Sequence, residues 1–238
     1  MNLREFLWAF RPHPSPALFS ERLKSGLAGG LGILLLAWAL HLLAQPQFPL
    51  MLLGSMAASA VLLYAVPHSP LAQPWNLIGG HLISALAGWL TISFVHDPLA
   101  AAGLAVGLAI FLMYVLDCLH PPGAATALTL VLGATQFQQM GMAWTLILVA
   151  ANAFGSLLLA LLINNALPRR HYPQRQAALP PVHAPEKMLM ILPEQQDMEW
   201  ALTQMDSALD ISVDDLSEIY WMSQQQAQAR YDAAKQRA

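Results

Sequence analysis

The 238-residue sequence is 56% hydrophobic with a formal net charge of −3, and its charges are distributed unevenly. Between Ser25 and Pro168 there is no Lys or Arg, and the only carboxylates are Asp97 and Asp117. A soluble domain of that length would carry interspersed surface charges, so the pattern indicates an integral membrane protein. It gives no support for a nucleic-acid partner.

Six apolar segments follow one another along the chain. Residues 1–24 are predicted to be a cytoplasmic N-terminal segment, without the small-residue cleavage pattern of a removable signal peptide. The apolar runs then cover residues 25–44, 49–66, 75–95, 99–116, 121–134 and 142–167. A helix needs roughly 20 apolar residues to cross a bilayer, and most of these runs are of about that length. They predict an all-α integral membrane protein with a six-span helical bundle over residues 25–167.

After Pro168 the chain becomes polar. Residues 168–195 are predicted to be a Pro-rich linker, and residues 196–238 an acidic, small α-helical cytoplasmic tail. Arginines and lysines flank the bundle on both sides, including Arg22, Lys24, Arg169 and Arg170. Basic flanks favour the cytoplasmic side, so both termini are predicted to be cytoplasmic, as an even number of spans requires.

Two pairs of segments resemble each other in the same order. Residues 26–36 and 103–113 share seven of eleven residues, and residues 57–63 resemble residues 124–130. Chance similarity between Gly-, Ala- and Leu-rich segments is the alternative. If a three-span unit is duplicated, its odd number of spans puts the halves in opposite orientations, which predicts a 3+3 inverted repeat with short second and fifth helices. That plan is common in secondary transporters.

The most specific local pattern runs from Asp117 to Leu128, where polar residues precede a helix of small residues. A helix over residues 121–134 would be about 21 Å long, shorter than the hydrocarbon core of about 30 Å, so it is predicted to begin inside the protein. The free N–H groups of its first turn would suit an anion, and Gly123 would allow close approach. The alternative is a Pro-initiated helix in which His120 bonds locally to Asp117.

Aligning the two repeats matches Ser55 with Pro122 and Ser59 with Thr126. This alignment predicts a second helix start, lined by Gly and Ser, opposite the first. Close packing of helices through small residues is the alternative explanation for these positions. Two polar residues of the third span must also turn inward. The resulting candidates for anion binding are Ser55, Ser59, Asn76, His81, His120, Pro121, Pro122, Gly123 and Thr126. For Asn76 a structural role is favoured, and for His81 structural and pathway roles are equally plausible.

Asp117 and His120 are further candidates for proton coupling, because the ordinary pKa of histidine lies nearest neutrality. These two residues are too few for a metal site, and the single cysteine, Cys118, excludes a site built from several thiolates. Nothing resembles a Walker motif or a nucleophile elbow. The sequence therefore predicts no catalytic residues, no metal and no cofactor.

Residues 120–128, His-Pro-Pro-Gly-Ala-Ala-Thr-Ala-Leu, resemble the HPP transmembrane family, which is named for that tripeptide. Residues 54–61, 67–74 and 76–81, and the stretch from Asn164 to Pro173, resemble the same family. The sequence departs from it at Gly123-Ala124, where the family often has Ala-Gly, and at Trp75, where it often has Arg. Plant plastid relatives are associated with nitrite transport, so the resemblance implies nitrite as a candidate substrate.

Together these features predict a transporter or channel for a small monovalent anion, nitrite-like, in a bacterial inner membrane. Its expected partners are membrane lipid and a small inorganic anion, with a homo-oligomer left open. Because no Lys or Arg lies in the spans, neutral donors are expected to hold the anion loosely enough for release. The alternative is a non-transporting membrane scaffold or sensor whose tail binds a partner, and a membrane enzyme is a weaker third choice.

Overall fold

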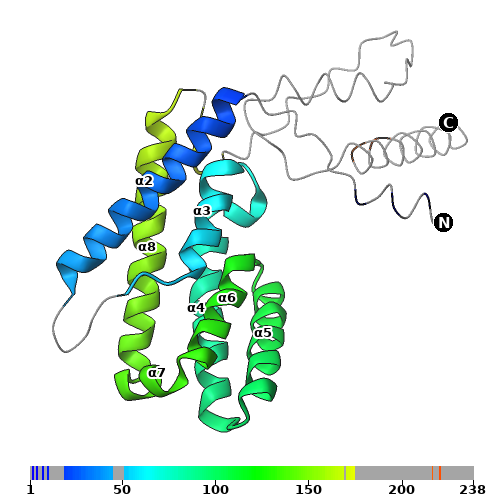
Figure 1. The fold of residues 1–238 in the computed structure, drawn as a ribbon, viewed down its shortest axis with the longest axis vertical. Helices are drawn as coiled ribbons and strands as arrows, with labels where there is room; N and C mark the ends of the chain where they lie inside the picture. Colours follow the sequence, from blue (N-terminus) through cyan, green and yellow to red (C-terminus); the bar gives the residue numbers. More distant parts are fainter. Residues whose placement is uncertain are drawn as a thin grey trace, which may run out of the picture. The chain divides into compact units, whose positions relative to one another are not determined.

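The computed structural model describes residues 19–44, 51–168 and 170–174, together with the isolated residues 2, 4, 7, 10, 216 and 220. The predicted tail helices of 196–238, and most of the linker 168–195, lie outside the described residues. The described chain is helical (Figure 1), with α2 (Phe19–Leu43), α3 (Ser55–Ala65), the 3-10 helix η1 (Pro70–Ala72), α4 (Pro74–Phe94), α5 (Pro98–Val115), α6 (Pro121–Leu132), α7 (Ala134–Met140) and α8 (Met142–Ala166).

Four of these helices, α2, α4, α5 and α8, are long and apolar enough to cross a membrane. Helices α3 and α6 are also apolar but have only 11 and 12 residues. At 1.5 Å per residue they rise about 16–18 Å, which is too short to cross a hydrocarbon core of about 30 Å alone. Each predicted apolar segment thus contains a helix, and the second and fifth are short as predicted.

Two boundaries differ from the prediction. Helix α2 begins at Phe19 rather than near residue 25, and its first turns carry an ion pair between Glu21 and Lys24 at 2.6 Å. The fifth predicted segment is divided at Gly133, which ends α6 and precedes the separate helix α7. The starts of α4, α5 and α6 at a proline agree with the sequence, because proline at the first position of a helix loses no hydrogen bond.

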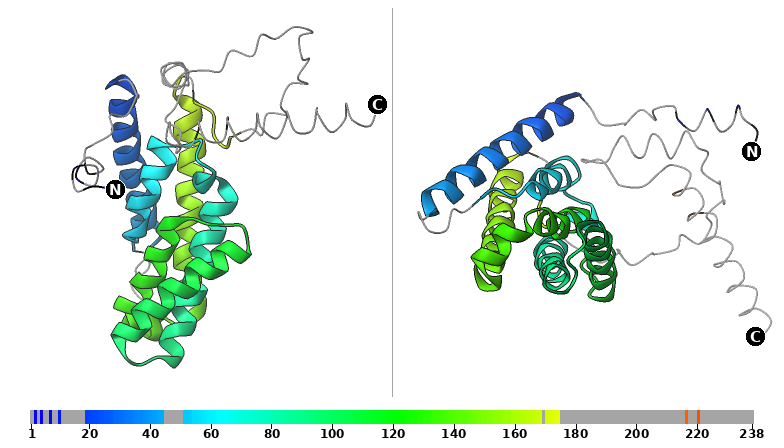
Figure 2. Two further views of the ribbon diagram at one scale, coloured as in Figure 1. Left: turned by 90° about the vertical axis from the view of Figure 1, so that its right-hand side faces the viewer. Right: turned by 60° about the horizontal axis from the view of Figure 1, so that its bottom comes forward.

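Helix α4 is the centre of the domain. It packs most extensively on α6 and also on α5, α8 and η1, whereas α2 packs on α3 and α8. Figure 2 shows α2 at the outer side of the bundle. Within the most apolar stretch of each helix, 56% of the residues are buried in α4 and 22% in α2. Most of the α2 surface is therefore available to lipid.

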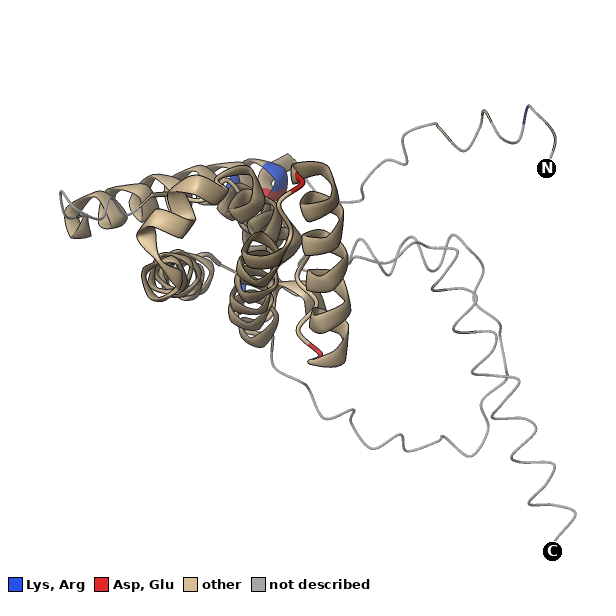
Figure 3. Cartoon of the chain, turned by 90° about the horizontal axis from the view of Figure 1, so that it is seen from below, with Lys and Arg blue, Asp and Glu red and all other residues tan. Residues whose placement is uncertain are grey.

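Charged residues are sparse on these helices. Figure 3 shows only a few blue or red segments, and the helices are otherwise tan. Large apolar side chains such as Leu34, Phe111 and Leu158 are exposed on the outside of α2, α5 and α8. An exposed surface of this kind is suited to lipid and not to water.

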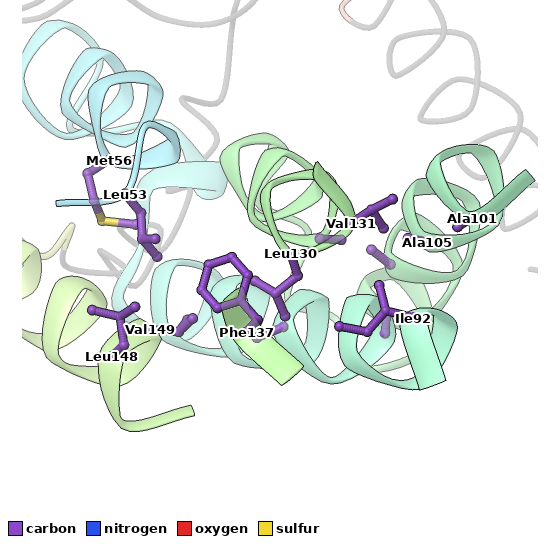
Figure 4. Packing of buried hydrophobic residues seen from close by; sticks show 14 of the residues in the cluster. Leu53, Met56, Ile92, Ala101, Ala105, Leu130, Val131, Phe137, Leu148 and Val149 are labelled. Carbon is purple, nitrogen blue, oxygen red and sulfur yellow. The ribbon is translucent and has the colours of Figure 1, made fainter. Parts of the chain in front are cut away.

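The core combines large side chains with small ones. Leu130, Phe137 and Val149 are buried in one apolar cluster with Ile92 (Figure 4). Helix α5 contributes alanines at every fourth position, Ala101, Ala105 and Ala109, all buried. Small residues at this spacing form one face of a helix and let the neighbouring backbone approach closely.

Helices α4 and α6 approach each other through glycine. A Cβ atom added at Gly123 would lie 2.6 Å from the carbonyl oxygen of Gly80 and 2.9 Å from Ser84 Oγ. One added at Gly88 would lie 2.9 Å from the carbonyl oxygen of Ala127. Contacts this short with backbone cannot be relieved by a side-chain rotation. The pair α4–α6 is therefore held at a backbone-to-backbone distance that only glycine permits.

We expect Gly123→Ala to lower the free energy of unfolding by about 1–3 kcal/mol, the usual cost of overpacking. Gly30→Ala in α2 is the matched control, because a Cβ there meets no atom within 4 Å and alanine is the better helix former. Thermal unfolding of the purified protein in detergent would compare the two variants. Equal melting temperatures would contradict the close packing described for α4 and α6.

Candidate functional site

The start of α3 is fixed by an asparagine in the middle of α8. Asn152 is fully buried, its Oδ1 accepts a hydrogen bond from the N–H of Leu53 at 3.1 Å, and its Nδ2 donates to the carbonyl oxygen of Met51 at 2.9 Å. These two bonds give hydrogen-bond partners to the non-helical backbone that leads into α3. Lipid offers no such partners. Helix α3 therefore begins halfway along α8, inside the domain.

The start of α6 offers fewer donors than the sequence suggested. Pro121 and Pro122, its first two residues, have no N–H. The N–H of Gly123 donates to the carbonyl oxygen of His120 at 2.7 Å. An anion-binding helix start depends on free N–H groups in the first turn, and three of those positions are thus without a free donor. The polar side chains near this start become the more important part of the site.

Five buried side chains, from α3, α4, α6 and the residue that precedes α6, form a continuous network, which we call the polar seam: Ser55, Ser59, His81, His120 and Thr126. Each is at most 2% exposed. Ser59 Oγ lies 2.9 Å from Nε2 of both His81 and His120. His81 Nδ1 lies 2.8 Å from Thr126 Oγ1, which is 2.8 Å from Ser55 Oγ. The two imidazoles meet edge to face, with 5.0 Å between ring centroids.

The protonation of the two histidines follows from the carbonyl oxygen at the end of the seam. Leu71 O can only accept, so His120 Nδ1 donates to it at 2.8 Å. In a neutral ring, His120 Nε2 then accepts from the Ser59 hydroxyl. Ser59 has one hydroxyl hydrogen, so Nε2 of His81 donates to Ser59 Oγ. Ser59 is therefore the junction at which both rings meet.

The structure brings five of the nine predicted anion-binding residues together in the seam. The others lie beside it. Asn76 donates from Nδ2 to the carbonyl oxygen of Leu119 at 2.9 Å, which agrees with the favoured structural role. Gly123 packs against α4, Pro122 is buried, and Pro121 is exposed at the helix start.

Asp117 ends helix α5 instead of contacting the seam. Its φ is +50°, a left-handed conformation that Asp tolerates. The N–H of Asp117 donates to Tyr114 O at 3.3 Å, and the N–H of Cys118 donates to Met113 O at 2.9 Å. These two bonds are a Schellman cap. Burial, followed by the charge of Asp117, raises the pKa of the Cys118 thiol.

Sequence analysis missed a buried arginine at the end of the domain. Arg170 had been assigned to the basic flank, but it is only 4% exposed. It contacts the starts and ends of three helices through Glu21, Ser25, Tyr64 and Asn164. Arg170 thus follows the last span in sequence, as the basic flank implies, but its side chain is buried against the helix ends. The available signal was the stretch from Asn164 to Pro173, which had been noted for its family resemblance alone.

The segment after α8 folds back to hold Arg170 in place. Asn165 Nδ2 donates to Tyr172 O at 2.6 Å, and the N–H of Tyr172 donates to Asn165 Oδ1 at 3.1 Å. The Tyr172 hydroxyl donates to Ala72 O in η1 at 2.7 Å. Burial, with a smaller effect of Tyr64, raises the pKa of Tyr172. These bonds to α8 and η1 make this segment part of the domain.

These observations define a class of protein. The described chain is a helical transmembrane domain with two short helices that meet at a buried polar seam. Comparison with known families then shows that the chain belongs to the HPP transmembrane family, since the family described as "HPP, transmembrane region" matches residues 14–173. The resemblance found in the sequence is thereby confirmed.

Two similar proteins are transmembrane proteins of Dictyostelium discoideum. One is 41% identical over 153 residues, covering 63% of this chain and 49% of the relative. The other is 42% identical over 151 residues, covering 62% and 53%. The match thus spans about half the length of each relative. Their descriptions name no substrate. No solved structure gives a significant match to the chain.

We expect Ser59→Ala to lower the free energy of unfolding by about 1–3 kcal/mol, because it leaves ring nitrogens of two buried histidines without their shared partner. Ser93→Ala is the control. Ser93 is exposed and bonds within its own helix, to Trp89 O, so its loss should cost less than about 0.5 kcal/mol. Chemical or thermal unfolding in detergent measures both. A Ser59→Ala protein as stable as Ser93→Ala would contradict the seam.

Proposed function

We propose that this protein transports a small monovalent anion, with nitrite as the leading candidate, through the region of the polar seam. The observation that supports it most is the meeting of two short helices, α3 and α6, at five buried polar side chains within a transmembrane domain. Interrupted or short helices at matching positions of two halves are the usual location of a transporter binding site. Buried polar groups in a membrane domain commonly line substrate pathways.

Transport requires the seam to open, because its side chains bond to one another in this structure. Ser59 and Thr126 supply hydroxyl donors and His81 and His120 supply imidazole N–H groups. Neutral donors bind an anion favourably but weakly, which allows release. Helices α4 and α6 are locked by glycine contacts, so the opening movement separates α3 from that pair. A 3+3 inverted repeat would supply the matching movement on the other side of the membrane.

Proton coupling is assigned to the histidine pair. His120 and His81 are joined through Ser59, whereas Asp117 is exposed and caps α5. An imidazole can gain and lose a proton near neutral pH when water reaches it. His120→Gln keeps a polar group at this position and removes titration. Retained uptake with a changed pH dependence would assign the proton to His120, whereas loss at every pH would assign it a positional role.

We expect proteoliposomes of the purified protein to take up nitrite, and Thr126→Val to weaken nitrite binding by about threefold to tenfold, the equivalent of one neutral hydrogen bond. Thr129→Val is a matched control on the same helix, because Thr129 Oγ1 bonds to Ala125 O of its own helix at 2.7 Å. Concentration-dependent uptake separates the two variants. Absence of nitrite flux from liposomes of correctly folded protein would reject the proposal.

The proposed location is a bacterial inner membrane with both termini in the cytoplasm. The support is the basic flank on each side of the bundle. A cytoplasmic reporter fused after Arg175 should be active in bacteria, and a periplasmic reporter at the same position should be inactive. Periplasmic activity would contradict the proposed orientation and the six-span count with it.

The second candidate is a membrane scaffold or sensor without transport. It is favoured by the complete internal pairing of the polar seam, which a purely structural network would also show. Partner binding by the tail 196–238 belongs to this candidate and concerns residues outside the described ones. Enzymatic activity is not part of either candidate. The liposome assay decides between them, since a scaffold passes no anion.

A further inference from the structure

Arg170 is a buried cation at one end of the transmembrane domain. Its side chain is 3% exposed. Nη1 donates to Tyr64 O, at the end of α3, at 2.9 Å. Nη2 donates to Glu21 Oε2 at 3.1 Å and to Ser25 Oγ at 2.9 Å, both near the start of α2. A charge removed from water needs an opposite charge beside it, and Glu21 is the anion that supplies it.

The contact with Glu21 uses half of the guanidinium edge that usually binds a carboxylate. Nε and Nη2 share that edge and normally hold two oxygens in parallel. Here Nη2 binds Glu21, while Nε is buried and has no hydrogen-bond partner among the described residues. The other carboxylate oxygen, Glu21 Oε1, accepts from Lys24 Nζ at 2.6 Å. One donor of the edge is thus paired with a carboxylate oxygen, and the donor beside it is buried without a partner among the described residues.

We propose that the Nε and Nη2 edge of Arg170 is a binding site for a small planar anion with two oxygens, such as nitrite, and that Glu21 occupies part of this site in the present structure. Nitrite has the same bent pair of oxygens and the same single charge as a carboxylate, so it fits the same edge. Lys24 keeps Glu21 paired when the anion takes its place. The inference rests on the proposed function, because it takes the transported anion as the ligand.

A short series of contacts joins Arg170 to the polar seam. Tyr172 donates to Ala72 O, and the neighbouring carbonyl oxygen of Leu71 accepts from His120 Nδ1. Both carbonyls belong to η1. Arg170 and the His120 end of the seam therefore lie at the same end of the domain. Arg170 binds the anion by charge at this end, and the neutral seam then receives it.

The test measures the binding of sodium nitrite to the purified full-length protein in detergent. Isothermal titration calorimetry gives the dissociation constant, and sodium fluoride keeps the ionic strength constant in a buffer free of chloride and carboxylates, because fluoride has no pair of oxygens. Glu21→Gln removes the competing charge and preserves the shape of the side chain. We expect this variant to bind nitrite at least about tenfold more tightly than the unchanged protein, and nitrite to raise its melting temperature by a larger amount.

Asp97→Asn is the matched control for Glu21→Gln. Asp97 is exposed and caps α5 by accepting from the N–H of Ala100, so this variant removes one negative charge without touching Arg170. Its nitrite affinity should equal that of the unchanged protein. Arg170→Lys keeps the positive charge and loses the two-donor edge, and it should bind nitrite at least about tenfold more weakly.

Three outcomes would overturn the Arg170 site. An unchanged nitrite affinity in Glu21→Gln, with only a lower melting temperature, would show that Arg170 and Glu21 simply fasten the helices. Chloride bound as tightly as nitrite would show that the site recognises charge and not a pair of oxygens. Unchanged binding in Arg170→Lys would show the same. Detergent binding does not depend on flux, so absent liposome uptake would reject transport while leaving the binding result intact.

Discussion

A backbone N–H or C=O inside a bilayer has no water to bond, and this constraint accounts for the placement of the buried amides. Each asparagine on α8 stands where backbone would otherwise lack a partner. Asn152 bonds Met51 and Leu53 ahead of α3. Asn164 bonds the carbonyl of Leu63 near the end of α3. Helix α3 can therefore begin and end within the domain because α8 presents amides at both of its ends.

The polar seam depends on the same constraint and on the glycines of α4 and α6. Gly80 and Gly123 let the two backbones approach, which brings His120 against α4 near His81. The interface of α4 with α6 combines close backbone contact with the bond between His81 and Thr126. Polar contacts between α3 and this pair are hydrogen bonds of Ser59 and Ser55. Hydrogen bonds can be exchanged for bonds to an anion. Backbone packing cannot, so the two interfaces differ in what they can do.

Sequence patterns predicted the helices well where a chemical signal marks the boundary. The prolines at positions 74, 98 and 121 each begin a helix, at or next to the start of a predicted apolar run. Five polar residues were selected as candidates because polar groups in apolar spans must turn inward, and the structure buries all five together. Their pairing was not predictable, since it depends on the register between helices distant in sequence. Arg170 was missed because its contacts also join residues distant in sequence. Hydropathy places it outside the bundle, and the bond from Tyr172 to Ala72 folds the chain back so that Arg170 is buried against the helix ends.

The contact between Glu21 and Arg170 joins residues 149 positions apart, and it has a consequence for the order of assembly during synthesis. Among the helices that the structure describes, α2 emerges first, yet it packs on α3 and on the last of them, α8. Arg170 leaves the ribosome after α8 is complete. The first helix must therefore remain in the bilayer with much of its docking face uncovered until translation has passed the final span, and a nascent chain stopped before Arg170 lacks the contact that fastens the two ends of the domain.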